Sequence, residues 1–152
     1  MIPADWKQEI GRFPPAPVVG GPRLIRKANE ARGRRLLVLD DDPTGSQSVH
    51  GVEVVMMGAT TPSDNAEEER EEILRALRDP GSTCFVLTNS RSLPESRAAA
   101  LAHHFGRLSV EIESRLGGPV AVVSRSDSTL RGHLITEVRA LDEGRREADG
   151  HG

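Results

Sequence analysis

Three short polar stretches of the sequence carry the residues that could do chemistry. Each directly follows an apolar run: DDDPTG comes after LLVL, TNSRS after CFVL, and SRSDSTLRGH after PVAVV. Carboxylates accept hydrogen bonds from hydroxyl groups or take protons from them, and the fork of an arginine binds a carboxylate at two points. Together these groups suit a small ligand that carries both hydroxyls and a carboxylate.

The first stretch contains three consecutive carboxylates, Asp40, Asp41 and Asp42. They repel one another, and a fold tolerates this best where a cation, a proton or a hydroxylated ligand compensates the charge. The alternative is a solvated loop in which an aspartate caps a turn before Pro43 and Gly45. The stretch by itself leaves both interpretations open.

The second stretch offers neutral hydrogen-bonding groups at Asn89 and Ser90 and a carboxylate-binding fork at Arg91. A helix beginning near Leu93 would point its free amides at the same space. The alternative is that Ser92 caps this helix and Arg91 lies on the surface.

The third stretch is the densest in charge. Arg125 and Arg131 can bind an anion, Asp127 can accept hydrogen bonds or a proton, and Gly132 allows close approach of the backbone before a helix. His133 is better explained as the residue at the helix start than as a catalyst. Hydroxyl groups are added by Ser126, Ser128 and Thr129.

Four apolar runs predict the strands that position these stretches: residues 35–40, 52–57, 84–89 and 119–124. They are short, rich in Val and Leu, and apolar on both faces, which is typical of strands inside a parallel sheet. Helical segments lie between the later runs. We therefore predict a single α/β domain with an open, mainly parallel sheet and flanking helices, Rossmann-like and three-layered. Ligands of such sheets bind at the carboxyl ends of the strands, so the polar stretches should converge.

Helix boundaries follow from start signals and apolar stripes. A short helix is expected from Pro22 to about Arg32, and capping-box spacing occurs at Asp64 with Glu67 and at Ser92 with Glu95. A last helix is expected over about 133–143. The residues predicted to face the core are Ile73, Leu74 and Leu77; Leu101, Phe105, Leu108, Ile112 and Leu116; and Leu134, Val138 and Leu141.

Composition limits the domain plan and the partners. Residues 1–22 are rich in Pro and Gly and predict an extended arm, residues 23–143 form the α/β domain, and 144–152 form a polar tail. The net charge is −3 and only four residues are aromatic, so a nucleic-acid partner is not expected. With no signal peptide and no membrane-spanning apolar run, we expect a cytoplasmic protein without a membrane partner. Cys84 is the one cysteine, which fits a small buried hydrophobe.

The stretches LDDDPTG, TNSRSL and SRSDSTLRGH, in this order, resemble the N-terminal domain of the four-carbon acid sugar kinase family, over about Arg35 to Leu141. The resemblance implies ATP-dependent phosphorylation of four-carbon sugar acids such as threonate, erythronate or their 3-oxo relatives at the terminal hydroxyl. It also implies that this domain holds the sugar acid and that a separate C-terminal domain binds ATP with Mg²⁺. These 152 residues contain no Walker loop and no GxGxxG. We therefore expect the chain alone to be inactive, with the nucleotide-binding domain as its partner, in cis or as a separate chain.

Carried over residue by residue, the resemblance assigns roles. On these matched positions we predict that Asp42 and Asp127 bind substrate hydroxyls and that one of them orients or deprotonates the attacking hydroxyl. Arg91 and Arg131 would hold the sugar carboxylate, with Arg125 in reserve, and no metal site is assigned to this chain. The other motif positions, taken as substrate-binding, are Asp41, Thr44, Gly45, Asn89, Ser128 and Gly132, beside Thr129 and Leu130. After His133 the chain reads LITE, whereas close relatives have an aromatic residue and a proline before the glutamate. This departure bears on the shape of the loop, while Glu137 keeps the acidic position.

Two alternatives remain. The run LLVLDDDPT contains DxDxT at Asp40, Asp42 and Thr44, which resembles the nucleophile motif of the haloacid-dehalogenase phosphatases, and FVLTN resembles their second motif. Their later motifs are not met, because no lysine follows Lys27 and SRSDSTLRGH lacks the paired acids that hold Mg²⁺. The second alternative is a non-catalytic module that binds a sugar acid.

Overall fold

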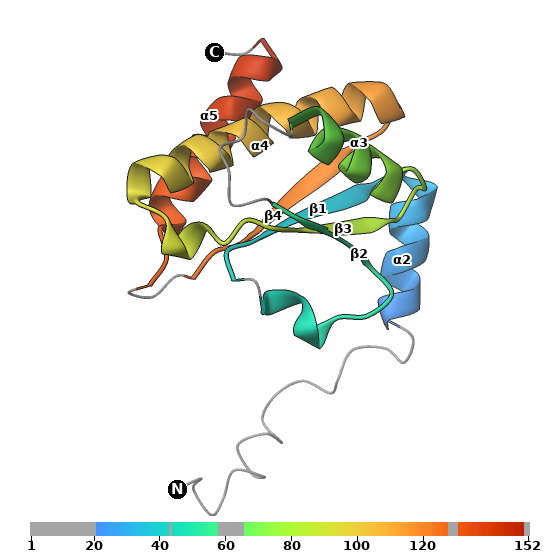
Figure 1. Cartoon of the computed structure of the whole chain (residues 1–152). Helices are drawn as coiled ribbons and strands as arrows, with labels where there is room; N and C mark the ends of the chain where they lie inside the picture. Colours follow the sequence, from blue (N-terminus) through green and yellow to red (C-terminus); the bar gives the residue numbers. More distant parts are fainter. Residues whose placement is uncertain (1–20, 43, 58–65, 128–130, 151–152) are drawn as a thin grey trace, which may run out of the picture.

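The computed structural model describes residues 21–42, 44–57, 66–127 and 131–150, and its centre is a sheet of four parallel strands (Figure 1). The strands are β1 (Arg35–Asp40), β2 (Glu53–Met56), β3 (Thr83–Leu87) and β4 (Val120–Arg125), in the order β2-β3-β1-β4. The predicted α/β class and parallel sheet are confirmed. All four apolar runs form strands, and the third ends at Leu87 rather than residue 89.

Three helices cover one face of the sheet: α3 (Ala66–Ala76), α4 (Glu95–Leu116) and α5 (Leu134–Ala148). The remaining described helix, α2 (Gly21–Ala31), lies on the other side, near the beginnings of the strands, and buries none of its residues (Figure 1). Two short 3₁₀ helices, η1 (Gly45–Ser48) and η2 (Ser90–Ser92), follow β1 and β3. No helix in the described part of the chain is long and apolar enough to cross a membrane.

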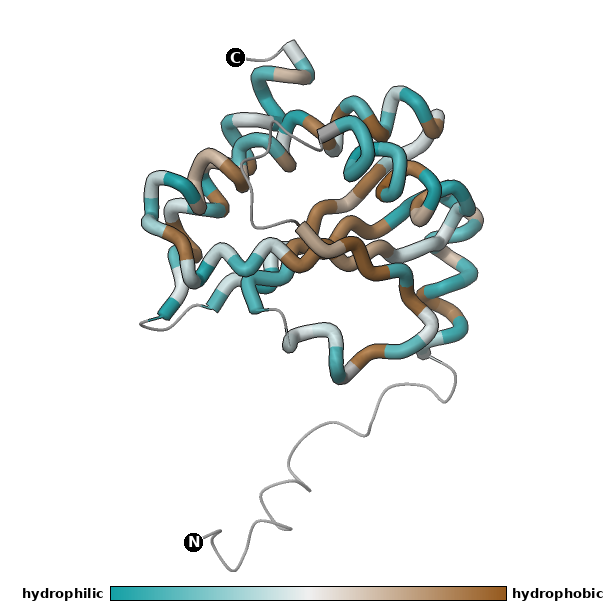
Figure 2. Tube along the Cα trace, viewed as in Figure 1, coloured by the Kyte–Doolittle hydropathy of each residue, from teal (hydrophilic) through white to brown (hydrophobic). Residues whose placement is uncertain are grey.

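The hydrophobic core lies between the sheet and these three helices, where Figure 2 shows the apolar strands beneath helices that are polar on their outer sides. Leu37 and Val86 of the central strands are fully buried. They belong to the same core cluster as Phe105 and Ile112, two residues of the stripe predicted for α4. Burial of such side chains stabilises each by about 2 kcal/mol. The stripe thereby fixes α4 over β1 and β3, and with it the ends of both strands.

The start of α4 differs from the prediction. The helix begins at Glu95 and has Pro94 at its N-cap, without a side-chain capping bond. Ser92 instead belongs to η2, and its hydroxyl donates to the carbonyl oxygen of Asn89. The capping-box interpretation of Ser92 is therefore wrong, because a separate 3₁₀ turn precedes the helix. Asp64, the other predicted cap, lies outside the described residues.

The last helix is longer than predicted, and it buries a different face. Helix α5 continues to Ala148, through residues assigned to a polar tail, while Val138 of the predicted stripe is 44% exposed. The buried positions are Glu137, Ala140 and Gly144. A Cβ at Gly144 would overlap the carbonyl oxygen of His103 in α4. The backbones of α4 and α5 therefore cross in close contact at Gly144. This contact lies beyond the predicted end of α5. The predicted arm falls almost entirely outside the described residues.

Candidate functional site

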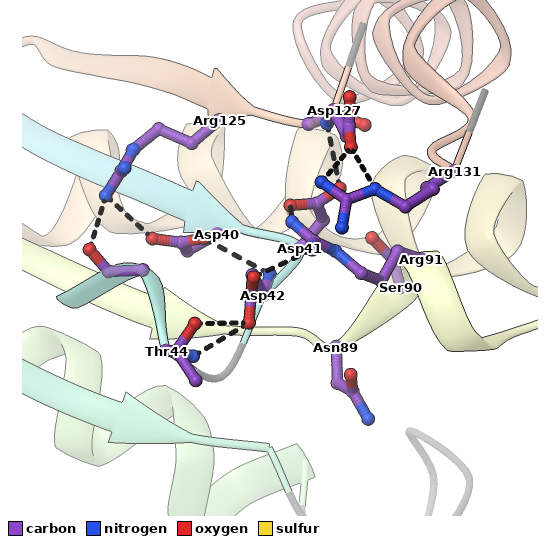
Figure 3. A network of polar contacts seen from close by, with 12 residues as sticks. Asp40, Asp41, Asp42, Thr44, Asn89, Ser90, Arg91, Arg125, Asp127 and Arg131 are labelled. Carbon is purple, nitrogen blue, oxygen red and sulfur yellow. Dashed lines mark hydrogen bonds and ion pairs between the residues drawn. The ribbon is translucent and has the colours of Figure 1, made fainter. Parts of the chain in front are cut away.

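The polar stretches meet at one end of the sheet because they follow three adjacent strands. β1 pairs with β3 on one side and with β4 on the other, and Asp40 lies level with Leu87 and with Arg125. Figure 3 shows the resulting network of side chains. We call it the polar edge, and its members are Asp40, Asp41, Asp42, Thr44, Arg91, Arg125, Asp127 and Arg131. The predicted convergence of the three stretches is confirmed.

Asp41 is the centre of the polar edge. Its side chain is 3% exposed, and its two carboxylate oxygens bind different strand ends. Oδ1 accepts a hydrogen bond of 2.9 Å from Nη2 of Arg91, which follows β3. Oδ2 accepts one of 2.8 Å from the backbone N–H of Asp127, which follows β4. Asp41 therefore joins all three predicted stretches, and its position is set by the fold.

Asp42 is held in the ionised form. Its Oδ1 accepts hydrogen bonds from the backbone N–H and the hydroxyl of Thr44 at 2.9 and 2.8 Å, and its Oδ2 lies 2.7 Å from Nη1 of Arg91. These two bonds from Thr44 are the main reason that the pKa of Asp42 lies below its ordinary value; burial opposes them, and the positive charges of Arg91 and Arg131 add smaller lowering effects. A carboxylate with a lowered pKa is a weak base. Asp42 is thus better suited to accept hydrogen bonds than to remove a proton.

Arg91 links the first two polar stretches through ion pairs. One terminal nitrogen binds Asp41 and the other binds Asp42, and the hydrogen bond to Asp41, followed by the negative charges nearby, raises the pKa of Arg91. Its Nε is buried and has no partner among the described residues. Asn89, two residues before Arg91, has a left-handed backbone conformation (φ 50°). In Figure 3 its side-chain amide points away from the ion pairs. The fork predicted to hold a ligand carboxylate is already bonded to two aspartates.

Arg131 is the most accessible cation of the polar edge. Its side chain is 73% exposed, and its Nε and Nη2 lie 3.1 and 3.0 Å from Oδ2 of Asp127, which is only 9% exposed. Gly132 follows Arg131, and a Cβ there would overlap the carbonyl oxygen of Asp127, so the close approach of these two backbone segments requires glycine. The carboxylate of Asp127, an acceptor, and the guanidinium of Arg131, a donor, therefore lie side by side. Ser128, with the neighbouring Thr129 and Leu130, lies outside the described residues.

Asp40 and Arg125 form a supporting ion pair. Asp40 is 2% exposed, and Nη1 of Arg125 lies 2.9 Å from its Oδ2 and 2.9 Å from the carbonyl oxygen of Gly45. Its Oδ1 accepts the N–H of Asp42, and a Cβ at Gly45 would overlap its carboxylate. Arg125 therefore ties η1 to the sheet. This arrangement disfavours Asp40 as the nucleophile of a phosphatase, because the carboxylate is buried and both oxygens are occupied.

A small cavity lies behind the polar edge, between the strand ends and helices α4 and α5. It borders Asp41, and a second buried carboxylate, Glu137, borders it from α5. Glu137 stands out in the sequence only through the family resemblance. The local sequence shows only that Glu137 is an acidic residue in the first turn of a helix. This pattern does not indicate that the side chain is buried. Hydroxyls of Thr88, Ser90, Ser124 and Ser126 complete the polar lining.

The described residues do not fit a site for Mg²⁺. No group of three or more His, Cys, Asp or Glu side chains in the described part is placed to hold a metal ion. The adjacent carboxylates of Asp41 and Asp42 are both bonded to Arg91, which competes with a cation.

Comparison with known protein families found a match. The family model described as "Sugar-binding N-terminal domain" matches residues 36–148, which run from β1 to the end of α5. No curated protein and no solved structure matches the chain. The matched residues include every member of the polar edge.

Proposed function

The chain belongs to the four-carbon acid sugar kinase family as its sugar-binding N-terminal domain, and from this premise we propose that the polar edge binds a four-carbon sugar acid. The class of acid is that of threonate, erythronate and their 3-oxo relatives. The acid would carry its carboxylate to arginine and its hydroxyls to aspartate. Family membership supports a sugar ligand, and the chemistry of the polar edge supports an acidic one.

One observation carries the proposal: Arg131 and Asp127 lie side by side at the open end of the sheet. The guanidinium is mostly exposed and can receive a carboxylate, and the neighbouring Asp127 can accept a hydroxyl hydrogen. Arg91 supports this pair from behind, because it fixes Asp41, which in turn holds the Asp127 backbone. A rigid arrangement of this kind limits the loss of side-chain freedom on binding.

Within a complete kinase this domain would place the sugar. Phosphoryl transfer depends mainly on in-line placement of the attacking hydroxyl and on exclusion of water. We assign the orienting role to Asp42, because its lowered pKa keeps it an acceptor, and the proton-accepting role to Asp127. ATP with Mg²⁺ would be supplied by a second domain, in cis or as a separate chain. On its own the 152-residue chain would bind the acid and transfer no phosphate.

A ligand-stabilisation screen tests the proposal. Thermal unfolding and calorimetry of the full chain would compare threonate, erythronate and 3-oxo acids with erythritol and threitol, which have four carbons and hydroxyls but no carboxylate. A ligand at about 100 times its Kd stabilises the folded state by about 2.7 kcal/mol. We expect at least one acid to bind roughly tenfold or more tightly than either polyol. Equal behaviour of acids and polyols, or no binding by any acid, would overturn the assignment.

A further inference from the structure

A buried carboxylate lies directly behind the polar edge and takes no part in the function proposed above. Glu137, in the first turn of α5, is 7% exposed. In the part of the chain that the structure describes, no Arg, Lys or His side chain forms an ion pair with it. Its Oε2 accepts a hydrogen bond from the hydroxyl of Ser126. Because an isolated buried carboxylate is strongly unfavourable, the fold must offset it, and Ser126 and the helix N-terminus do so in part.

The cavity that Glu137 and Asp41 both border is lined by polar as well as apolar residues. The space in which the centre of a water molecule could lie has a volume of about 20 Å³. A volume of this size is sufficient for one water molecule, which would need two to four polar partners. The lining offers them, because hydroxyls of Thr88 and Ser90 border the same space as both carboxylates. The cavity is too small for a sugar acid, so a ligand at the polar edge would leave the contacts of Glu137 in place.

The hydrogen bond from Ser126 to Glu137 lies one residue before Asp127 in the chain. Ser126 is the residue before Asp127, and its own N–H lies 3.3 Å from the Ser124 hydroxyl. Asp127 then donates its N–H to Asp41 and receives Arg131 on its carboxylate. A shift of the Ser126 side chain would therefore move the Asp127 peptide and its carboxylate together.

From these contacts we infer that Glu137 is a positioning residue, which acts through the hydroxyl of Ser126 to hold Asp127 at the polar edge. The inference deepens the proposed function and rests on it for the ligand. It concerns the placement of Asp127, so it also has a consequence that can be measured without ligand.

The ligand-independent test is hydrogen exchange of the Asp127 amide, followed by NMR. In Glu137→Ala the exchange should be about tenfold faster or more, because the peptide opens more readily. In Glu137→Gln it should stay near the wild-type rate, since the amide oxygen of Gln still accepts from Ser126. The reference is the Thr88 amide, which donates to the Asp40 carbonyl oxygen at 2.9 Å and should not change. Equal exchange at Asp127 in the Ala variant and the wild type, or equal damage by Gln and Ala, would overturn the inference.

Thr136→Val is the matched control. Thr136 lies in the same first turn of α5, but its hydroxyl donates to Glu95 of α4. The control therefore loosens the start of α5 without touching Ser126. If it accelerates Asp127 exchange as much as Glu137→Ala, the effect belongs to the helix start and the inference fails. If Glu137→Ala does not fold, Ser126→Ala removes the same hydrogen bond and should give the same faster exchange.

Ligand binding separates this inference from the proposed function. With the best acid of the screen, Glu137→Ala and Ser126→Ala should each raise the Kd about tenfold, and the double variant should be no worse than either. Fully additive effects would contradict action through one shared contact. If the wild type binds no acid while Asp127 exchange responds as expected, the proposed ligand is wrong and the positioning stands. If the acid binds and neither measurement responds to Glu137→Ala, the positioning is wrong and the proposed function stands.

Discussion

The backbone N–H of Asp127 donates a hydrogen bond of 2.8 Å to the carboxylate of Asp41, although the two residues are 86 positions apart in the sequence. The bond joins the ends of β1 and β4, and the ion pair of Asp41 with Arg91 adds the end of β3. One buried side chain thus holds three strand ends in register at the site where we expect the ligand.

Replacement of Asp41 should therefore lower stability. In Asp41→Ala the partly buried Arg91 and the Asp127 amide lose their acceptor, and such a loss typically reduces the free energy of unfolding by about 3 kcal/mol. Urea denaturation followed by circular dichroism measures the change. Asp142→Ala is the control, because Asp142 forms an exposed ion pair with Arg146 and its loss should change stability by less than about 0.5 kcal/mol. Equal effects of the two variants would contradict the central role of Asp41.

Replacement of Arg131 should weaken binding more than folding. Arg131→Ala removes the exposed guanidinium, and a hydrogen bond to a charged group contributes at least about 1.5 kcal/mol, or roughly tenfold in Kd. Calorimetry with the best acid of the screen measures it. The matched variant is Arg146→Ala, since Arg146 pairs with Asp142 at the same spacing of four residues and is 66% exposed, away from the polar edge. Unchanged affinity in Arg131→Ala would remove this residue from the site.

Thr44 should control the titration of Asp42. Because its two hydrogen bonds are the main cause of the lowered pKa, Thr44→Val should raise the pKa of Asp42 toward its ordinary value of 3.8, which NMR titration can follow. A lowered pKa stabilises the folded state at pH values above the unfolded-state pKa, and this stabilisation is lost as the pH falls through the folded-state pKa. The stability difference between wild type and variant should therefore be full at pH 7 and should shrink below about pH 4. A pH-independent difference would point to packing instead.

The close crossing of α4 and α5 should not tolerate a methyl group. A Cβ at Gly144 overlaps the backbone of His103, so Gly144→Ala must separate the helices, which costs about 1–3 kcal/mol. Gly21→Ala is the control, because a Cβ there meets nothing within 4 Å and its φ is not positive. We expect the control to be neutral or slightly stabilising in urea denaturation, as alanine favours a helix. A neutral Gly144→Ala would show that the helices can adjust.

Cys84 should be chemically inert in the folded protein. Burial, followed by the charges of Glu53 and Glu72, raises the pKa of its thiol to about 12, and the residue is fully buried. The reactive thiolate is therefore scarce at pH 8. Thiol labelling with a disulfide reagent should be slow in the native chain and fast in urea. Rapid labelling of the folded chain would mean that β3 opens often.

The strands and their convergence could be predicted because they depend on local composition. Runs of Val and Leu on both faces predict parallel strands, and parallel strands bring their carboxyl ends to one edge. The long apolar stripe of α4 was equally clear, since four of its five residues are buried: Leu101, Phe105, Leu108 and Ile112.

The remaining features depend on contacts between distant residues. Ser92 has capping spacing, but the 3₁₀ turn after β3 takes its hydroxyl. Val138 fits an apolar stripe, yet the close contact at Gly144 turns another face of α5 toward α4. The pairing of Arg91 with Asp41 and Asp42 follows from the strand order, which local patterns do not specify. The same holds for the burial of Glu137.

Every arginine of the polar edge is already bonded to an aspartate, and this affects which anions the edge can accept. The three guanidinium groups face four carboxylates, so the formal charge of the described cluster is −1. An approaching acid therefore gains little from general attraction. It must exchange partners, offering hydroxyl hydrogens to an aspartate in return for a share of the arginine. Acetate or chloride brings charge without hydroxyls and cannot complete that exchange, so under the proposed function selectivity comes from the hydroxylated chain as much as from the carboxylate.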